Sequence, residues 1–229
     1  MVAAPQLDGL ENSFNRGCAA GDLDLVKQYI GLGWDIEHSL PDGTRAIHIT
    51  TINQRTSILN LLITNGVQVD VRLKSGLSAL HFAAAAGWCD GIRMLLDSGT
   101  ADINAIDNSG ITPLHNAAIC NRLDAMRLLV WRGAAMDMRE RHGLCPLRLA
   151  VQNGQILAVK QLLLLGANVH ARDRNRRSSL HLAAELGFVE IARALITYGA
   201  DKNALNSERK TPIETMRPPY LRALVDLLI

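Results

Sequence analysis

The sequence predicts an all-α solenoid, a stack in which one helical unit repeats along the chain. Glycine recurs in steps of 33, 33, 34, 33 and 33 residues, at Gly33, Gly66, Gly99, Gly133, Gly166 and Gly199. A short motif and an apolar stretch recur in the same register between these glycines. Aromatic residues make up only 4% of the 229 residues, so small and aliphatic side chains must form the core. A fixed period of this length is typical of repeat architectures and not of a single globular core.

The repeating motif opens each unit. Residues 76–84, 110–118, 143–151 and 176–184 share a leucine, then histidine or arginine, then an alanine two positions later. Each copy continues through a second apolar stretch and ends on a glycine, as in residues 162–166 and 194–199. We therefore expect each unit to be a turn, a first helix, a second antiparallel helix and a loop.

Residues at the expected helix ends agree with this division. The first helical position, where a missing N–H is tolerated, is occupied by Pro113, Pro146 and Pro212. Hydroxyl side chains that can cap a helix precede it at Ser78, Thr112, Ser178 and Thr211. Between the two helices, glycine can end a helix in the left-handed conformation at Gly21, Gly87, Gly154 and Gly187.

The unit resembles the ankyrin repeat, whose signature is Thr-Pro-Leu-His-x-Ala. Residues 112–117 match this signature in full, and the resemblance covers roughly residues 10 to 229. It implies an ankyrin-repeat solenoid that binds other proteins. The predicted division is a tail (1–9), an N-terminal capping repeat (10–40), five repeats (41–73, 74–107, 108–140, 141–173 and 174–206) and a truncated C-terminal capping repeat (207–229).

The residues that could carry chemistry favour a structural role. One slot of the repeat holds His48, His81, His115 and His181. Neighbouring repeats lie about 10 Å apart, whereas zinc needs ligands near 2 Å, so these histidines cannot share a metal. The resemblance implies that they hydrogen-bond the backbone between repeats. No phosphate loop, nucleophile elbow or zinc-protease motif occurs, and we expect a protein that is not an enzyme and needs no cofactor or metal.

Four cysteines, Cys18, Cys89, Cys120 and Cys145, lie in different repeats without the close pairing of disulfide frameworks or zinc sites. We expect free thiols and a reducing compartment. The first residues lack the regions of a secretory signal, and the longest apolar run is too short to cross a bilayer. The expected location is the cytoplasm or the nucleus, with a secreted effector left open.

Charge divides the chain into two halves. Residues 1–107 hold 7 Lys and Arg against 12 Asp and Glu, whereas residues 108–229 hold 17 against 10. The excess positive charge of the second half gathers at the expected turn tips of the last three units. Asymmetry of this kind points to a charged partner.

Two surfaces are therefore predicted to bind a partner protein, in a monomer or a hetero-complex. The basic turn tips contribute Arg141, His142, Arg174, Asn175 and Arg177. An inner groove contributes Trp88, Ile119 and Cys120, with Ile111 and Leu144 at neighbouring tips. Because arginine pairs bidentately with carboxylate and phosphate, the partner should carry an acidic or phosphorylated segment.

Two other interpretations of the basic tips remain open. One is that the arginines are simply solvated, since turn tips face water. A stripe of cations can also bind nucleic acid or an anionic lipid surface. Nucleic acid is disfavoured because no aromatic residue lies among the arginines to stack on bases.

Overall fold

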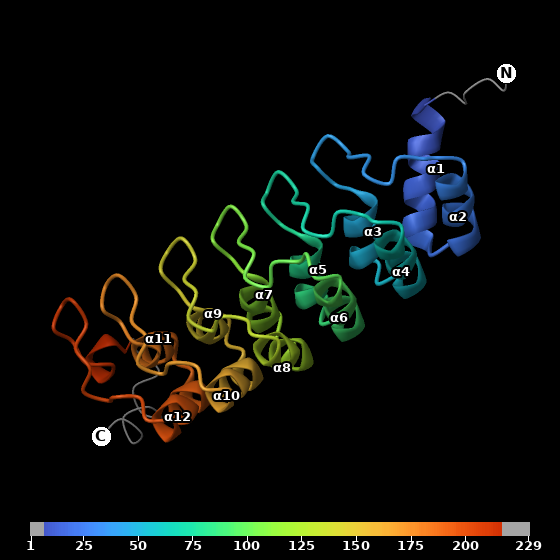
Figure 1. Ribbon diagram of the computed structural model, residues 1–229. Helices are drawn as coiled ribbons and strands as arrows, with labels where there is room; N and C mark the ends of the chain where they lie inside the picture. The colour runs from blue at the N-terminus through green and yellow to red at the C-terminus, as the bar shows by residue number, and fades with distance from the viewer. Residues whose placement is uncertain (1–6, 217–229) are drawn as a thin grey trace.

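The computed structural model describes residues 7–216, which form an elongated, gently curved stack (Figure 1). These residues contain twelve α-helices and one short 3-10 helix, with no β-strand. Two isolated antiparallel bridges, Arg72 to Ser78 and Arg172 to Ser178, are their only sheet-like pairs. The predicted all-α solenoid is confirmed.

The helices come in antiparallel pairs. The first pair is α1 (Leu7–Ala20) and α2 (Leu23–Gly31). The inner helices are α3 (Ala46–Ile52), α5 (Ala79–Ala86), α7 (Pro113–Ile119), α9 (Pro146–Gln152) and α11 (Ser179–Leu186). The outer helices are α4 (Thr56–Thr64), α6 (Cys89–Asp97), α8 (Leu123–Trp131), α10 (Ile156–Leu164) and α12 (Val189–Thr197). A 3-10 helix, Ile213–Thr215, ends the described chain.

The ends of the stack differ from the prediction in one respect. Helix α1 begins at Leu7, so the last three residues of the predicted tail 1–9 are helical. The helix expected at residues 224–229 lies outside the described residues. The remaining predicted repeat boundaries stay predictions.

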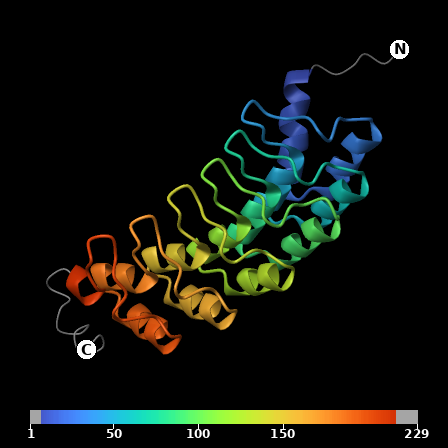
Figure 2. The same ribbon diagram turned by 60° about the vertical axis from the view of Figure 1, so that its left-hand side comes forward.

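Six hairpins, which we call fingers 1 to 6, project from the stack beside the inner helices (Figures 1 and 2). They are residues 40–44, 73–77, 107–111, 140–144, 173–177 and 206–210. In each, the first residue donates its N–H to the C=O of the last, at 2.8 to 3.1 Å. The stack bends toward the side on which the fingers lie, so fingers and inner helices together line its concave face (Figure 1).

The repeated histidines hold neighbouring repeats together, as the resemblance implied. In His48, His81, His115 and His181, Nδ1 accepts the N–H of the residue that precedes the helix, at 3.1 to 3.2 Å. Because Nδ1 is an acceptor, Nε2 carries the proton. In His81, His115 and His181 it donates to a backbone C=O of the next repeat at 3.0 to 3.2 Å, and in His48 it donates to the C=O of Val71, just before finger 2, at 3.2 Å.

Small side chains let the inner helices pack closely. Ala83, Ala84, Ala117 and Ala118 are fully buried, and leucine and isoleucine fill the space under the outer helices. The N-terminal capping repeat adds an aromatic cluster in which the rings of Phe14, Tyr29 and Trp34 lie 5.8 to 6.0 Å apart. The four glycines predicted to end first helices all have positive φ, between 66° and 88°.

Repeat four departs from this pattern because Arg148 stands in the histidine slot. Its side chain is only 1% exposed. Nη1 donates to the C=O of Arg177, the bond that histidine makes elsewhere, and Nη2 donates to Asp173 at 3.0 Å. The Nε–H has no hydrogen-bond partner. The interface between repeats four and five therefore contains a buried ion pair where its neighbours have a neutral ring.

Candidate functional site

A side-chain acceptor at the start of each of fingers 3 to 6 holds the turn in place. Asp107, Glu140, Asp173 and Asn206 occupy the same position, and one side-chain oxygen of each accepts two backbone N–H groups at 2.8 to 3.0 Å. Backbone bonds also join neighbouring fingers, as from Arg141 N–H to Ser109 C=O at 2.8 Å. A partner therefore meets tips that are already ordered.

Most basic side chains of these fingers have no acidic partner. Within the described residues, no carboxylate forms an ion pair with Arg139, Arg141, Arg172, Arg174, Arg176 or Arg209. The first half differs, since Arg45, Arg72 and Arg93 each pair with a carboxylate. These six arginines lie in or directly before fingers 4 to 6, and all except the half-buried Arg172 are exposed to solvent.

Two of these arginines reach back by one finger in the same way. Arg141 donates from Nη2 to the C=O of Asn108 in finger 3 at 3.0 Å. Arg174, one repeat later, donates from Nη2 to the C=O of Arg141 in finger 4 at 2.7 Å. Each guanidinium is fixed by one N–H, and both side chains are exposed.

Two other arginines occupy the turn position that holds glycine in fingers 1 to 4. Arg176 and Arg209 have φ of 58° and 60°, and both are exposed. For a residue other than glycine, the left-handed conformation costs about 1 kcal/mol. Fingers 5 and 6 therefore keep a cation at the tip although it strains the backbone.

The structure corrects the expectation for Arg177. Its side chain bonds Asp173 at 2.9 Å and Glu185 at 3.1 Å, so it belongs to the ion-pair network around Arg148 and is not a free cation. His142 and Asn175, in contrast, are exposed at their tips as predicted.

The predicted groove is only partly present. Trp88 precedes α6 and is buried, with 8% of its surface exposed. Its ring packs directly over Gly91, where an added Cβ would lie 2.0 Å from the ring. Trp88 is therefore a packing residue, and the prediction that it lines the groove is wrong. Cys120 is exposed, whereas Ile111, Ile119 and Leu144 are half-buried.

Trp131 is an exposed aromatic side chain that the sequence left ambiguous. It ends α8 on the outer face, and 77% of its surface is exposed. The Arg132 guanidinium lies 6.0 Å from the ring centroid. The residue at the end of the outer helix is polar in some repeats and apolar in others. The sequence therefore gave no signal that the Trp131 ring would face solvent.

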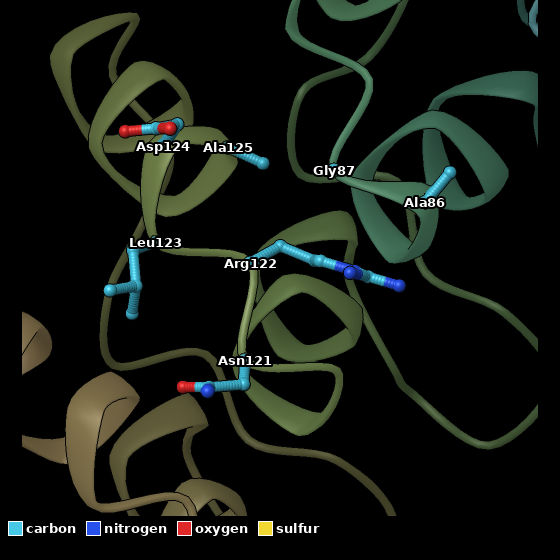
Figure 3. Close-up of a pocket in the computed structure, with 7 residues that line it drawn as sticks. All are labelled: Ala86, Gly87, Asn121, Arg122, Leu123, Asp124 and Ala125. Carbon is cyan, nitrogen blue, oxygen red and sulfur yellow. The ribbon is translucent and has the colours of Figure 1, made fainter.

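A shallow hollow between the α5–α6 turn and the α7–α8 turn is a structural joint (Figure 3). Arg122 points across it toward Ala86 and Gly87, and its Nε–H donates to the C=O of Ala85 at 2.9 Å. Asn121 points the opposite way, and its Oδ1 accepts the N–H of Ala158 in α10 at 3.0 Å. The two side chains therefore link repeat three to both of its neighbours.

We expect Asn121→Ala to lower the free energy of unfolding by about 1.5 kcal/mol, because it removes a helix cap and puts alanine at a φ of 55°. Asn121→Gly removes the same hydrogen bond but fits the left-handed backbone, so it should cost about 1 kcal/mol less than Asn121→Ala. Urea unfolding of both variants measures the difference. Equal losses would show that the backbone conformation at this turn is not strained.

The cysteines are free thiols, as predicted. Cys18 and Cys145 are buried, and burial raises the pKa of Cys18 to about 11. Among residues 7–216, no group of three or more His, Cys, Asp or Glu side chains is placed to hold a metal ion. No helix in that part of the chain is long and apolar enough to span a membrane.

Comparison with known proteins agrees with this architecture. A family model of ankyrin repeats matches residues 15–107, 99–173 and 147–215. The ankyrin repeat domain of Bcl-3, described as a member of the IkappaB family, is 29% identical, with a TM-score of 0.83 over 93% of this chain and 97% of that one. The human ASB11 ankyrin repeat domain is 24% identical and has the same fold, with a TM-score of 0.83 over 94% and 97%.

Ankyrin repeat domains are generally modules for protein–protein interaction and are typically not enzymes. The three matches of the family model together span residues 15–215, almost the whole of the described chain. The chain belongs to the ankyrin repeat family.

Proposed function

We propose that this protein is a non-catalytic scaffold that binds a partner protein through the concave face of its stack. Fingers 3 to 6 receive an acidic or phosphorylated segment of the partner. The half-buried apolar side chains of Ile111, Ile119 and Leu144, together with exposed Cys120, contact the partner beside that segment.

The observation that carries the proposal is the uncompensated charge on rigid tips. Among residues 7–216, no carboxylate forms an ion pair with Arg141, Arg174, Arg176 or Arg209. Guanidinium groups bind carboxylate and phosphate through paired hydrogen bonds. Since the acceptors beneath the tips already order the loops, little conformational entropy is lost when a partner docks.

The proposal predicts that Arg141→Glu with Arg174→Glu abolishes capture of the partner from lysate. The control is Arg127→Glu with Arg193→Glu, which changes the net charge equally on exposed outer helices. We expect the wild type and the control to retain at least one common protein that the finger variant loses. If all three proteins capture the same set, the fingers are not the binding surface.

The same experiment separates nucleic acid from protein. Nuclease treatment of the lysate leaves a protein complex intact, whereas it removes anything held through nucleic acid. Electrostatic binding to a phosphate backbone would also weaken steeply as salt rises. No Phe, Tyr or Trp lies in fingers 3 to 6, so these tips lack the large aromatic rings on which bases usually stack.

A further inference from the structure

We propose that the outer face of α10, with the end of α8, is a second binding surface that holds an amphipathic α-helix of a partner protein. The apolar stripe of that helix packs on Trp131, Leu157 and Leu164. One acidic residue within the stripe pairs with Lys160, and we call these four residues the outer patch. The outer helices lie on the side of the stack away from the fingers, so this inference goes beyond the proposed function and does not depend on it (Figure 1).

The solvent-facing side of α10 lacks the ion pair that neighbouring outer helices carry. In α6, α8 and α12 an acidic residue pairs with the arginine three positions later: Asp90 with Arg93, Asp124 with Arg127 and Glu190 with Arg193. In α10 the equivalent positions hold Leu157 and Lys160. One turn later, Leu164 stands where three other outer helices have Thr64, Asp97 and Thr197. Only this helix therefore combines two apolar residues with a cation at these positions.

Leu157 and Leu164 face solvent from one side of α10. Their exposed fractions are 51% and 69%. They stand about two helical turns apart, so they lie above one another on the same face of the helix. Surface helices normally present polar side chains to solvent. Single exposed leucines are common, but apolar residues grouped on one exposed face mark a binding site.

The apolar surface continues from α10 onto α8. Helix α10 packs between α8 and α12 (Figure 1). Trp131 occupies in α8 the position that Leu164 occupies in α10. Its exposed ring lines a hollow of about 650 Å³ together with the half-buried side chains of Leu128 and Leu165. Tryptophan is frequent among the residues that dominate binding energy, so a partner gains most where it covers this ring.

Lys160 determines the charge that the partner must carry. Its side chain is exposed between the two leucines, and within residues 7–216 no carboxylate forms an ion pair with it. Glu190 lines the same hollow between α10 and α12, but its carboxylate pairs with Arg193 at 3.8 Å. A partner that covers the leucines must therefore supply an acidic residue, or it removes water from an ammonium group that has no counter-charge.

The same lysine argues against a second copy of this chain as the occupant. Two copies related by a two-fold axis would bring the same patch of each together. Antiparallel packing of Leu157 on Leu164 across that axis would then set the two Lys160 side chains opposite each other. Like charges in contact disfavour an interface, so a different protein with a carboxylate at this point fits better.

The backbone of the outer patch restricts the form of the bound segment. Helices α8 and α10 make their backbone hydrogen bonds internally, so they offer no strand edge to which an extended peptide could add. Helices pack on one another through ridges of residues three or four positions apart. A partner helix with apolar residues at positions i, i+3 or i+4, and i+7 presents a matching stripe.

The first test uses three fluorescent, alanine-based helical peptides. One has a leucine stripe with a central glutamate, the second has lysine in place of that glutamate, and the third has its leucines spread around the helix. We expect the glutamate peptide to bind the wild type about threefold more tightly than the lysine peptide by anisotropy. The third peptide should bind at least about tenfold more weakly, because it buries less apolar surface.

The Lys160→Glu variant should reverse the preference, so that the lysine peptide binds more tightly than the glutamate peptide. Equal affinities of these two peptides for the wild type, or an unchanged preference in the variant, would overturn the inference. Absence of binding by all three peptides would overturn it as well.

The second test removes the leucines without disturbing the core. Leu157→Glu with Leu164→Thr gives α10 the residues that α12 has at Glu190 and Thr197, so the urea midpoint should stay close to that of the wild type. Its affinity for the glutamate peptide should fall about tenfold or more. The control, Leu32→Thr with Leu205→Thr, replaces two exposed leucines outside the outer patch and should bind like the wild type. Equal affinities of the variant and the control would contradict the proposed site.

Two measurements distinguish other occupants of the outer patch. We expect no dimer in sedimentation velocity, and a dimer that the Leu157→Glu with Leu164→Thr variant abolishes would mean that a second copy covers the patch. Vesicles of phosphatidylcholine and phosphatidylserine should not bind, and binding that the same variant loses would assign the patch to a membrane surface. The Arg141→Glu with Arg174→Glu variant should bind the glutamate peptide like the wild type, so failure of the finger experiment leaves this inference standing.

Discussion

Asp173→Asn is expected to lower the free energy of unfolding by about 3 kcal/mol or more, since it leaves the guanidinium of Arg148 buried without a counter-charge. The substitution also replaces Oδ2, which accepts from Arg148 Nη2 and Arg177 Nε, with an NH2 group that cannot accept a hydrogen bond. Asn206 occupies the equivalent position of finger 6, where its Oδ1 accepts two backbone N–H groups as Asp173 does. The bonds within finger 5 should therefore survive the change.

The electrostatics of the pair agree with this expectation. Burial lowers the pKa of Arg148, and the charge of Asp173 opposes that effect. Burial alone would raise the pKa of Asp173, but the Arg177 amide and the charges of Arg148 and Arg177 hold it below its ordinary value. Each partner thus keeps the other ionised inside the stack.

A double-mutant cycle isolates the pair. Arg148→His restores the residue found in this slot at His48, His81, His115 and His181, whose Nε2 can reach the same kind of C=O. In that background Asp173→Asn should cost less than about 1 kcal/mol in urea unfolding, because no buried cation remains. A similar loss in both backgrounds would mean that Asp173 acts through the finger and not through Arg148.

The periodic parts of this fold could be predicted from the sequence because each repeat makes the same local contacts. The capping residues Thr112 and Ser178, the helix-ending Gly87 and Gly187, and the bonds of the histidine slot all lie where the register placed them. These features depend on residues within one repeat or in its immediate neighbour.

The candidate site was harder to predict because exposure depends on contacts that the register does not contain. Arg177 and Arg174 are both arginines of one finger, yet only Arg177 has carboxylates within reach. Trp88 falls in a slot at the edge of the groove, but Gly91, one turn later, lets its ring fold down against α6. Whether a side chain is exposed depends on its ion pairs and on the direction in which it points. Neither of these follows the period of 33 residues.

Acidification from pH 7 to pH 5 is expected to destabilise the stack through its histidines. Burial lowers the pKa of His48, His81 and His181 below the ordinary value, and it lowers that of His115 to about 4. The carboxylates of Glu140 and Asp107 act on His115 in the opposite direction, but burial outweighs them. The His115 ring is therefore mainly neutral in the folded protein at pH 5, and the other three rings take up protons at a lower pH than they do in the unfolded chain.

The unfolded chain behaves differently, because its histidines take up protons near pH 6.5. The unfolded state then binds more protons than the folded state, so stability falls as the pH drops below about 6.5 and continues to fall toward the folded pKa. For His115 alone, the loss between pH 7 and pH 5 is about 2 kcal/mol. The other three histidines add to it in the same direction.

Urea unfolding at pH 7 and pH 5 measures the total loss, and His115→Gln identifies the share of one ring. Glutamine does not titrate in this range, so the variant should be less stable than the wild type at pH 7 but lose about 2 kcal/mol less on acidification. An NMR titration of the His115 ring provides the direct check. If the ring titrates near pH 6.5 in the folded protein, burial does not hold it neutral, and the acid sensitivity must come from other groups.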